Sequence, residues 1–242
     1  MLNYIFYVVL KVKFYIYNIV KMSAKHAYIF DLDDTLIQSN SLIYVYNQYS
    51  ELIDKINSRD YVKKRGVISE YYKKGYKVDT TEFGGSGNCL ISDRRSYDFL
   101  YNGITLHKQL NILKNISQND NIDIYIVTGR ANKPESIKEL IYEKFGISIL
   151  LNNIYPVGNR EKMDLLWYKL NKNEHYGIID LLKNGKNAAN YKKSALYDIL
   201  RKKYNFVNFY DDDPENINCF DNLVEELKNI GFHFISNSYL IK

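Results

Sequence analysis

Short apolar runs separated by polar clusters and longer amphipathic stretches dominate the pattern along this chain. The clearest runs are AYIF at 27–30, IDIYIV at 122–127 and FVNFY at 206–210. Runs of this length and composition are typical of buried strands in a parallel sheet. The stretches between them place apolar residues three and four positions apart, as helices do. The pattern therefore predicts an α/β fold with a Rossmann-like, mostly parallel sheet flanked by helices.

The predicted helices fill most of the intervals between these strands. Further strands are predicted at 147–151 and 231–236. The helical spacing covers 39–76 (including Leu42, Val45, Tyr49, Ile53 and Ile56), 92–117, 134–145, 190–204 and 219–230. FGGSGN at 83–88 predicts a turn or loop. Residues 152–187 have no assigned role.

Polar residues follow each of the three clearest strands. The first strand runs into DLDDT at 31–35, the second into TGR at 128–130 and the third into DDD at 211–213. Open α/β sheets build their sites at the carboxyl ends of their strands, so these residues are expected to meet. Three adjacent acids repel one another unless a cation or a lysine compensates them. The pattern predicts a charged site at this edge of the sheet.

The first and second of these clusters are far apart in the chain. Between Thr35 and Thr128 lie 92 residues, more than a direct connection needs. We therefore expect a core made of residues 23–37 and 101–242, with residues 38–100 forming a helical insertion after the first strand.

Residues 1–22 form an aromatic and apolar N-terminal extension of uncertain status. They contain Lys11, Lys13 and Lys21 and no acid, so the net charge of +5 falls to +2 without them. Their longest uncharged run has ten residues, which is too short to span a bilayer. Three interpretations stay open: an extra strand or hairpin, a membrane-surface or targeting segment, or a non-native extension upstream of Met22.

The composition is that of a globular protein. The chain has 46% hydrophobic and 25% charged residues, with 3 prolines in 242 residues, which disfavours long disordered linkers. Cys89 and Cys219 have no metal-binding spacing, so reduced thiols and a cytoplasmic location are expected. The small excess of positive charge is weak support for a nucleic-acid partner.

The order of the polar clusters resembles a known family. DxDxT, then TGR, then a lysine before a helix, then DDD is similar to the four motifs of the haloacid dehalogenase superfamily of phosphatases. The stretch NYKKSALYDILRKKYNFVNFYDDDPENINCF looks most like the polynucleotide-repair group, which includes the Swiss Army Knife RNA repair-like proteins. The resemblance covers 27–36, 122–150 and 188–236. Because members of this superfamily carry insertions called caps, it implies that the helical insertion at 38–100 is cap-like and lies over the site. Asp213 stands where those repair enzymes often carry arginine, and Asp34 where many members carry glycine.

This resemblance implies a mechanism based on an aspartyl-phosphate. Asp31 would be the nucleophile, Asp33 the general acid and then base, and Thr128 a donor to the phosphoryl oxygens. Lys192 would balance the negative charge, as an aromatic residue followed by lysine fits Tyr191-Lys192, although helical spacing does not exclude Lys193. Mg²⁺ would be bound by Asp31, the Asp33 backbone carbonyl, and Asp211 or Asp212, since oxygen ligands suit a hard cation.

The expected function is a Mg²⁺-dependent phosphomonoester hydrolase. Phosphorylated nucleic-acid ends are one substrate class, favoured by basic and tyrosine residues that track phosphates and stack on bases, at Lys63, Lys64, Arg65 and 71–74. A solvated helix face explains the same residues equally well. The alternatives are a small-molecule or nucleotide phosphatase and a non-catalytic binding protein on the same fold. The oligomeric state stays open.

Overall fold

A five-stranded parallel sheet forms the centre of the molecule. The computed structural model describes residues 25–85, 89–173 and 188–242, so the interpretations of residues 1–22 lie outside it. The strand order is β10-β9-β1-β7-β8, and each neighbouring pair is parallel. The bounds are β1 (His26–Phe30), β7 (Ile122–Thr128), β8 (Ile154–Pro156), β9 (Phe206–Asp211) and β10 (Ile235–Leu240).

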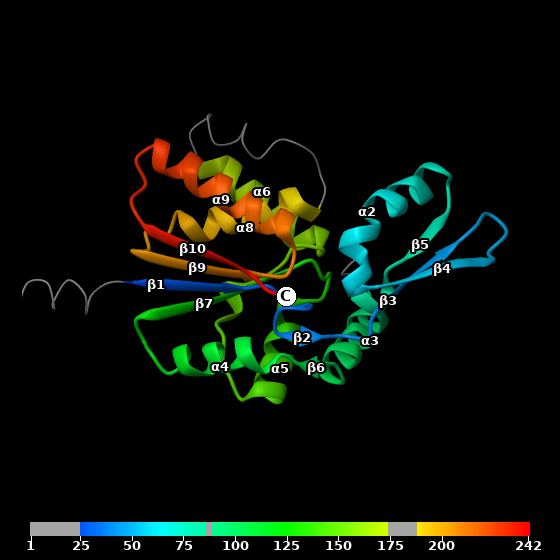
Figure 1. Cartoon of the computed structure of the whole chain (residues 1–242), viewed down its shortest axis with the longest axis horizontal. Coiled ribbons are helices and arrows are strands. Elements are labelled where there is room, and N and C mark those ends of the chain that lie inside the picture. The colour runs from blue at the N-terminus through cyan, green and yellow to red at the C-terminus, as the bar shows by residue number, and fades with distance from the viewer. Residues whose placement is uncertain (1–24, 86–88, 174–187) are drawn as a thin grey trace, which may run out of the picture.

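Helices cover both faces of this sheet (Figure 1). One face carries α6 (Arg160–Asn173), α8 (Ala188–Leu200) and α9 (Pro214–Asn229), and the other carries α3 (Leu90–Tyr101), α4 (His107–Ile116) and α5 (Pro134–Phe145). A parallel sheet needs cover on both faces because its central strands are apolar on both sides. The predicted α/β class, with a parallel sheet flanked by helices, is confirmed.

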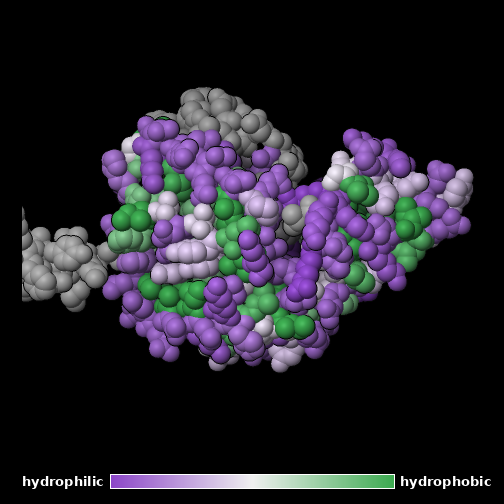
Figure 2. Space-filling model, in the orientation of Figure 1, coloured by the Kyte–Doolittle hydropathy of each residue, from purple (hydrophilic) through white to green (hydrophobic). Residues whose placement is uncertain are grey.

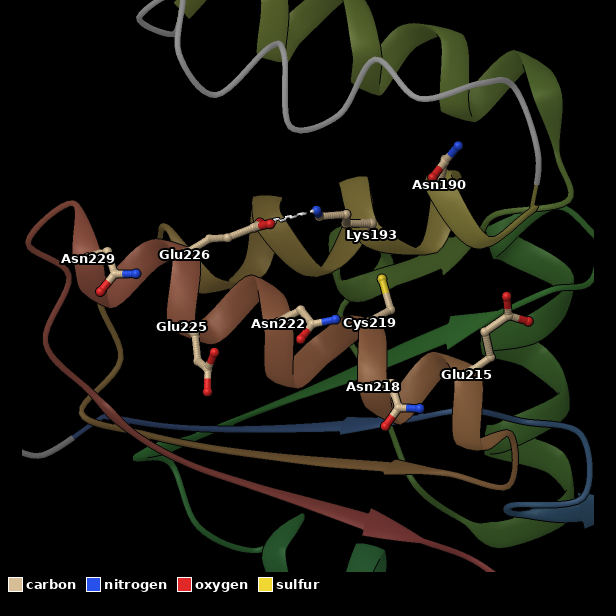
Figure 3. Close-up of a pocket in the computed structure, with 9 residues that line it drawn as sticks. All are labelled: Asn190, Lys193, Glu215, Asn218, Cys219, Asn222, Glu225, Glu226 and Asn229. Carbon is tan, nitrogen blue, oxygen red and sulfur yellow. Dashed lines mark hydrogen bonds and ion pairs between the residues drawn. The ribbon is translucent and has the colours of Figure 1, made fainter.

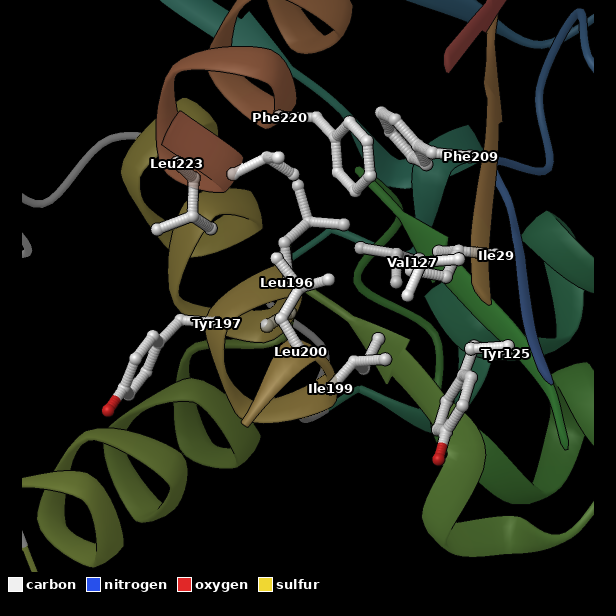
Figure 4. Close-up of a cluster of buried hydrophobic side chains, with 14 of the residues drawn as sticks. Ile29, Tyr125, Val127, Leu196, Tyr197, Ile199, Leu200, Phe209, Phe220 and Leu223 are labelled. Carbon is white, nitrogen blue, oxygen red and sulfur yellow. The ribbon is translucent and has the colours of Figure 1, made fainter. Parts of the chain in front are cut away.

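The core beneath α8 and α9 fixes the strands that lead to the polar clusters (Figure 4). Ile29, Val127 and Phe209 project from three neighbouring strands and are fully buried. They meet Leu196 of α8 and Phe220 of α9, which are also fully buried. Close packing of this kind holds backbone positions firmly, so the ends of β1, β7 and β9 are well fixed.

The chain between β1 and β7 forms two small antiparallel sheets. A short pair, β2 (Ile37–Gln38) and β6 (Ile104–Thr105), joins the chain where it leaves and re-enters the core. The other sheet has the order β4-β3-β5, with β3 (Leu42–Tyr46), β4 (Leu52–Asn57) and β5 (Lys77–Asp79). It is accompanied by α2 (Ser58–Lys73) and the short 3-10 helix η1 (Thr81–Phe83). We call residues 39–85 the accessory lobe.

The predicted helix over Leu42–Ile56 is wrong, because this stretch is the β3–β4 hairpin. Ile43, Val45 and Ile56 are buried against Ile68 of α2, while the tyrosines between them are partly exposed. That is the period-two burial of a strand. When tyrosine is counted as apolar, every position in LIYVY is apolar, so the helical spacing arose by coincidence. The insertion is therefore mixed in structure, with helices at α2 and α3.

Other predicted elements also differ from the structure. The helix predicted at 92–117 is two helices, α3 and α4, separated by β6, and the helix predicted at 190–204 ends at Leu200. No strand is assigned at 147–151; a second 3-10 helix, η2 (Leu151–Asn153), precedes β8. Ile147 and Ile149 are nevertheless buried, which explains their strand-like pattern. The last helix begins at Pro214 rather than 219, and the last strand runs 235–240 rather than 231–236.

The visible surface is largely hydrophilic, and hydrophilic side chains gather along the boundary between core and accessory lobe (Figure 2). Within the described ranges, no helix combines the length and apolar character that crossing a bilayer requires.

Candidate active site

The carboxyl ends of β1 and β9 bring Asp31 and Asp211 together. The register pairs Phe30 with Tyr210, and the Asp31 backbone N–H donates to the Tyr210 carbonyl at 2.9 Å. Lys192, from α8, places its ammonium between the two carboxylates. Its Nζ lies 2.8 Å from Asp31 Oδ1 and 2.6 Å from Asp211 Oδ2. All three side chains are buried, so they form one tightly coupled charged group.

The electrostatics of this group depend on burial. Burial raises the pKa of Asp31 well above its usual value; Lys192 opposes this, and the neighbouring aspartates add to it. Burial would lower the pKa of Lys192, but the Asp211 and Asp31 carboxylates outweigh it and raise that pKa. Burial, and then the charge of Asp211, raise the pKa of Asp212 to about 7. Asp31 and Asp212 therefore ionise less readily than free aspartates, and a cation bound beside them would favour their ionised forms.

Asp31, Asp211 and Asp212 fit a hard divalent cation. One carboxylate oxygen from each lies within 4.8 Å of the others, and among the described residues this is the group with that geometry. With all three ionised and Lys192 protonated, two negative charges remain unbalanced, which a divalent cation would offset. A set of oxygen ligands alone suits Mg²⁺.

Asp33 points away from this cluster and is held by Arg130. Arg130 Nε donates to Asp33 Oδ2 at 2.8 Å, and Nη2 donates to Oδ1 at 2.7 Å. Such a bidentate pair fixes the carboxylate in one orientation. The structure thus separates the two aspartates of DxD, with Asp31 facing lysine and the acidic cluster and Asp33 facing an arginine.

Arg130 was not singled out by the sequence, although it is the last residue of TGR. Its side chain is fully buried. Besides Asp33, its guanidinium donates to partners from three other parts of the chain: Ser39 Oγ, Ser41 Oγ, the Glu82 carbonyl and Ser96 Oγ. A strand-end arginine was visible in the sequence, but nothing there indicated partners that lie 34 to 97 residues away.

The loop after β7 is tightly packed. Thr128 is fully buried, and its hydroxyl accepts from the Arg130 N–H at 3.3 Å, whereas the next residue, Gly129, lines the cavity. Gly158 follows β8 and lies against this loop, where an added Cβ would be 2.4 Å from the Gly129 carbonyl oxygen. Only glycine permits that approach. The structure brings Asp31, Asp33, Asp212 and Lys192 to the cavity and keeps Thr128 behind it.

Asp34 has an unusual backbone conformation for an aspartate. Its φ is 53°, in the left-handed region that glycine favours. Burial raises the pKa of its carboxyl group, and a hydrogen bond from Ser58 acts against this. Arg59 of α2 lies 3.5 Å from Asp34 Oδ1. The positive φ explains why glycine would be suited to this position. The contact with Arg59 links the loop after β1 to the accessory lobe.

A second link joins the accessory lobe to the loop after β9. Asp213 caps the start of α9 by accepting from the Glu215 N–H at 3.0 Å. Arg65 of α2 forms ion pairs with both Asp213 and Glu215. The third acid of DDD thus has a structural role as a helix cap and as a contact to the lobe, in contrast to Asp211 and Asp212.

The core and the accessory lobe together enclose a cavity of about 440 Å³. From the core, Asp31, Asp33, Lys192, Asp212 and Arg130 face it. From the lobe, the lining includes Ile43, Ser58, Tyr61, Arg65, Thr80 and Phe83. A cavity of this size is in the range of pockets that hold small organic ligands, about 300–1,000 Å³. The pocket therefore combines charged groups from the core with a lobe lining that is partly aromatic.

Lys193 lies on the other side of α8 and has a different partner. Its Nζ is 3.1 Å from Glu226 Oε2 of α9, in a separate polar groove between α8 and α9 that also contains Cys219 (Figure 3). The choice between Lys192 and Lys193, which helical spacing left open, is thus resolved geometrically: Lys192 contacts Asp31.

Comparison of the chain with models of protein families, with curated proteins and with solved structures finds no match in any of the three.

Proposed function

We propose that this chain is a Mg²⁺-dependent phosphomonoester hydrolase that works through an aspartyl-phosphate. The observation that carries the proposal is the arrangement at the end of β1. Asp31 lies with Lys192, Asp211 and Asp212 in one cluster. Asp33, two residues later in the chain, lines the same cavity but is hydrogen-bonded to Arg130. Two carboxylates in such different surroundings are suited to different roles. The resemblance of the four motifs to the haloacid dehalogenase superfamily supports the same reaction.

In the first step, an Asp31 carboxylate oxygen attacks phosphorus. A new P–O bond to Asp31 forms while the P–O bond to the substrate alcohol breaks. Asp33 gives its proton to the departing alcohol oxygen and is left as a carboxylate. Splitting hydrolysis into two displacements in this way is the usual benefit of a covalent intermediate.

In the second step, a water molecule displaces the Asp31 carboxylate from phosphorus. Asp33 takes a proton from the water as its oxygen attacks phosphorus, and the bond to Asp31 breaks to release phosphate. The Arg130 guanidinium faces the ionised form of Asp33, which is the form that accepts this proton. Arg130 therefore acts as a positioning residue for the base.

Charge on the phosphoryl oxygens must be offset throughout. Mg²⁺ held by Asp31, Asp211 and Asp212, with the Asp33 backbone carbonyl as a further ligand, would supply part of that compensation. Lys192 supplies another part, since its pKa is raised and it stays protonated beside Asp31. Thr128, behind the cavity, accepts from the Arg130 N–H in the loop whose Gly129 lines the cavity.

The accessory lobe acts in this proposal as a cap that restricts the substrate. Its α2 borders the cavity and is tied to the loops after β1 and β9 by Arg59 and Arg65. Several basic and tyrosine residues of α2 that suggested nucleic-acid ends have acidic partners within the chain: Lys64 and Tyr71 with Asp54, Arg65 with Asp213, and Lys73 with Glu70. They therefore favour the solvated-face explanation, and the cavity becomes the better guide to substrate.

The test is phosphate release by the full chain in Mg²⁺ and in EDTA. The panel has a 3′-phosphorylated oligonucleotide, a 5′-phosphorylated one, mononucleotides, glycerol phosphate and an aryl phosphate. We expect Mg²⁺-dependent turnover that is lost in Asp31→Asn. Asp120→Asn, at an exposed acid in the loop before β7, is the matched control and should retain full activity. Equal activity in Asp31→Asn and wild type would refute the mechanism, and no turnover of any substrate would favour a binding protein.

A further inference from the structure

The cavity extends well beyond the space that a phosphoryl group needs. The reacting groups occupy one wall, while Ile43, Tyr61 and Phe83 contribute an apolar and aromatic wall from the accessory lobe. A substrate that reaches Asp31 with its phosphate must place its alcohol portion against that second wall. The chemistry of this wall therefore indicates the chemistry of the alcohol.

Phe83 is held firmly beside the proposed acid. The Ala131 N–H donates to the Phe83 carbonyl at 2.9 Å, and the Arg130 guanidinium, which holds Asp33, lies 4.8 Å from the Phe83 ring centroid. Gly84 follows in a left-handed conformation, with φ of 93°. Its Cα approaches the loop so closely that an added Cβ would be 2.8 Å from the Asn132 nitrogen. The Phe83 ring thus lies against the Arg130 guanidinium, which in turn holds Asp33, the proposed acid.

Tyr61 supplies a second ring from α2. The Arg65 guanidinium lies 5.6 Å from the Tyr61 ring centroid, and Arg65 is itself anchored by Asp213 and Glu215. Thr80, which also lines the cavity, offers a hydroxyl group. Two anchored rings and a hydroxyl suit a flat ligand that stacks through its face and forms hydrogen bonds through its edge.

We propose that Tyr61 and Phe83 bind a planar aromatic ring in the alcohol portion of the substrate, as a nucleobase provides. This inference rests on the proposed function and narrows it to phosphomonoesters of nucleosides, either free or at the end of a nucleic acid. The two sources share the ring and the phosphate, and the test separates them.

Binding is measured first, because it does not require turnover. Asp31→Asn in Mg²⁺ is titrated calorimetrically with adenosine 5′-monophosphate and with ribose 5-phosphate, which lacks the base. We expect the nucleotide to bind at least about fivefold more tightly, the lower range of a single base–ring stack. A 3′-phosphorylated dinucleotide titrated beside the mononucleotide shows whether a chain end or a free nucleotide is the better source.

The ring variants then test the wall itself. Phe83→Leu and, separately, Tyr61→Leu in the Asp31→Asn background keep apolar bulk but remove the ring, so each should bring the ratio of the two affinities toward one. Tyr49→Leu, at an exposed tyrosine in the same lobe, should leave the ratio unchanged. Circular dichroism checks that each variant is folded. If one of the two ring variants does not fold, the other one provides the test.

The outcomes separate this inference from the proposed function. Equal binding of the two ligands, or a ratio that both ring variants leave intact, would overturn the inference even where Asp31-dependent turnover occurs. A ring preference that depends on Phe83 or Tyr61, without any turnover, would support the inference and reject the phosphatase.

Discussion

At the scale of single residues, the structure assigns opposite surroundings to Asp31 and Asp33. Asp31 shares a buried cluster with two further carboxylates and a lysine, while Asp33 is held by the Arg130 guanidinium, which also donates to other groups. Removing one carboxyl group should therefore affect different steps of the reaction. This separation leads to a kinetic prediction for Asp33, and the raised pKa of Asp212 leads to a thermodynamic one.

The kinetic prediction concerns Asp33→Asn. An alkoxide needs a proton in order to leave, whereas an aryl oxide does not. With an aryl phosphate, only the second step should therefore be slowed. We expect a rapid burst of aryl oxide followed by slow turnover, and a loss of about 10²–10⁴-fold in the rate with glycerol phosphate. Stopped-flow absorbance measures the burst. Loss of the burst itself would mean that Asp33 is needed before the leaving group departs, even when no proton is required.

The thermodynamic prediction concerns Asp212 and pH. Its pKa is about 7 in the folded chain against a usual value of 3.8. Between these values the folded state holds a proton that the unfolded state has lost, so stability falls as pH rises. In EDTA, we expect the melting temperature to decrease from pH 5 to pH 8. Mg²⁺ should raise it more at pH 8 than at pH 5, because protons and the cation compete for the same oxygens.

Differential scanning calorimetry measures both trends. Asp212→Asn removes the titrating group, so in EDTA its melting temperature should depend less on pH than that of the wild type. A melting temperature that rises steadily from pH 5 to pH 8 in EDTA would contradict the prediction.

At the scale of elements, two glycines provide a matched test of how the accessory lobe contacts the core. Gly84→Ala places a methyl group against the loop after β7 at a positive φ, and should destabilise the protein by about 1–3 kcal/mol. Gly66→Ala, within α2 and with no atom within 4 Å of the added Cβ, should stabilise it by about 0.5–1 kcal/mol. Urea denaturation compares the two variants. Equal effects would show that the Gly84 contact contributes little.

Local signals decided which elements the sequence could predict. The helix from Pro134 to Phe145 was placed correctly at both ends, because proline begins it and Gly146 ends it in the left-handed conformation. The three clearest strands were also found, since each is an apolar run bounded by polar residues. The β3–β4 hairpin was missed because its tyrosines conceal the two-residue period, and its Asn47 turn carries no glycine or proline.

The site shows the same division between local and distant information. The acids after β1 and β9 were identifiable because they follow strong strands, and parallel strands bring their ends to one edge. The partners of Arg130 and Arg65 could not be predicted, since each pairing depends on how the accessory lobe folds. Lys192 and Lys193 are equivalent by spacing, and only the position of α8 relative to β1 distinguishes them.

At the scale of the whole molecule, the accessory lobe is expected to be less stable than the sheet. Its buried cluster holds four residues, whereas each face of the sheet carries a far larger one. Regions with few buried apolar contacts open at lower free energy. Amide hydrogen exchange should therefore be faster in β3 and β4 than in β1, β7 and β9.

Salt provides the accompanying test. The pairs of Arg59 with Asp34 and of Arg65 with Glu215 each have an exposed partner, so about 1 M salt should weaken them by screening. Exchange in the lobe should then accelerate while exchange in β1 and β9 does not change. Slower exchange in the lobe than in the sheet would contradict the expected order of stability.

Arg130 connects three parts of the molecule, because the six atoms that accept hydrogen bonds from its guanidinium belong to the core, the accessory lobe and α3. A molecule with a formed sheet but an undocked lobe would already hold the carboxylate cluster, yet would lack several contacts that orient Asp33. Competence for the reaction would then arrive last in folding. Such a dependence would act as an assembly checkpoint, in which the proposed hydrolysis becomes possible only once the accessory lobe has docked.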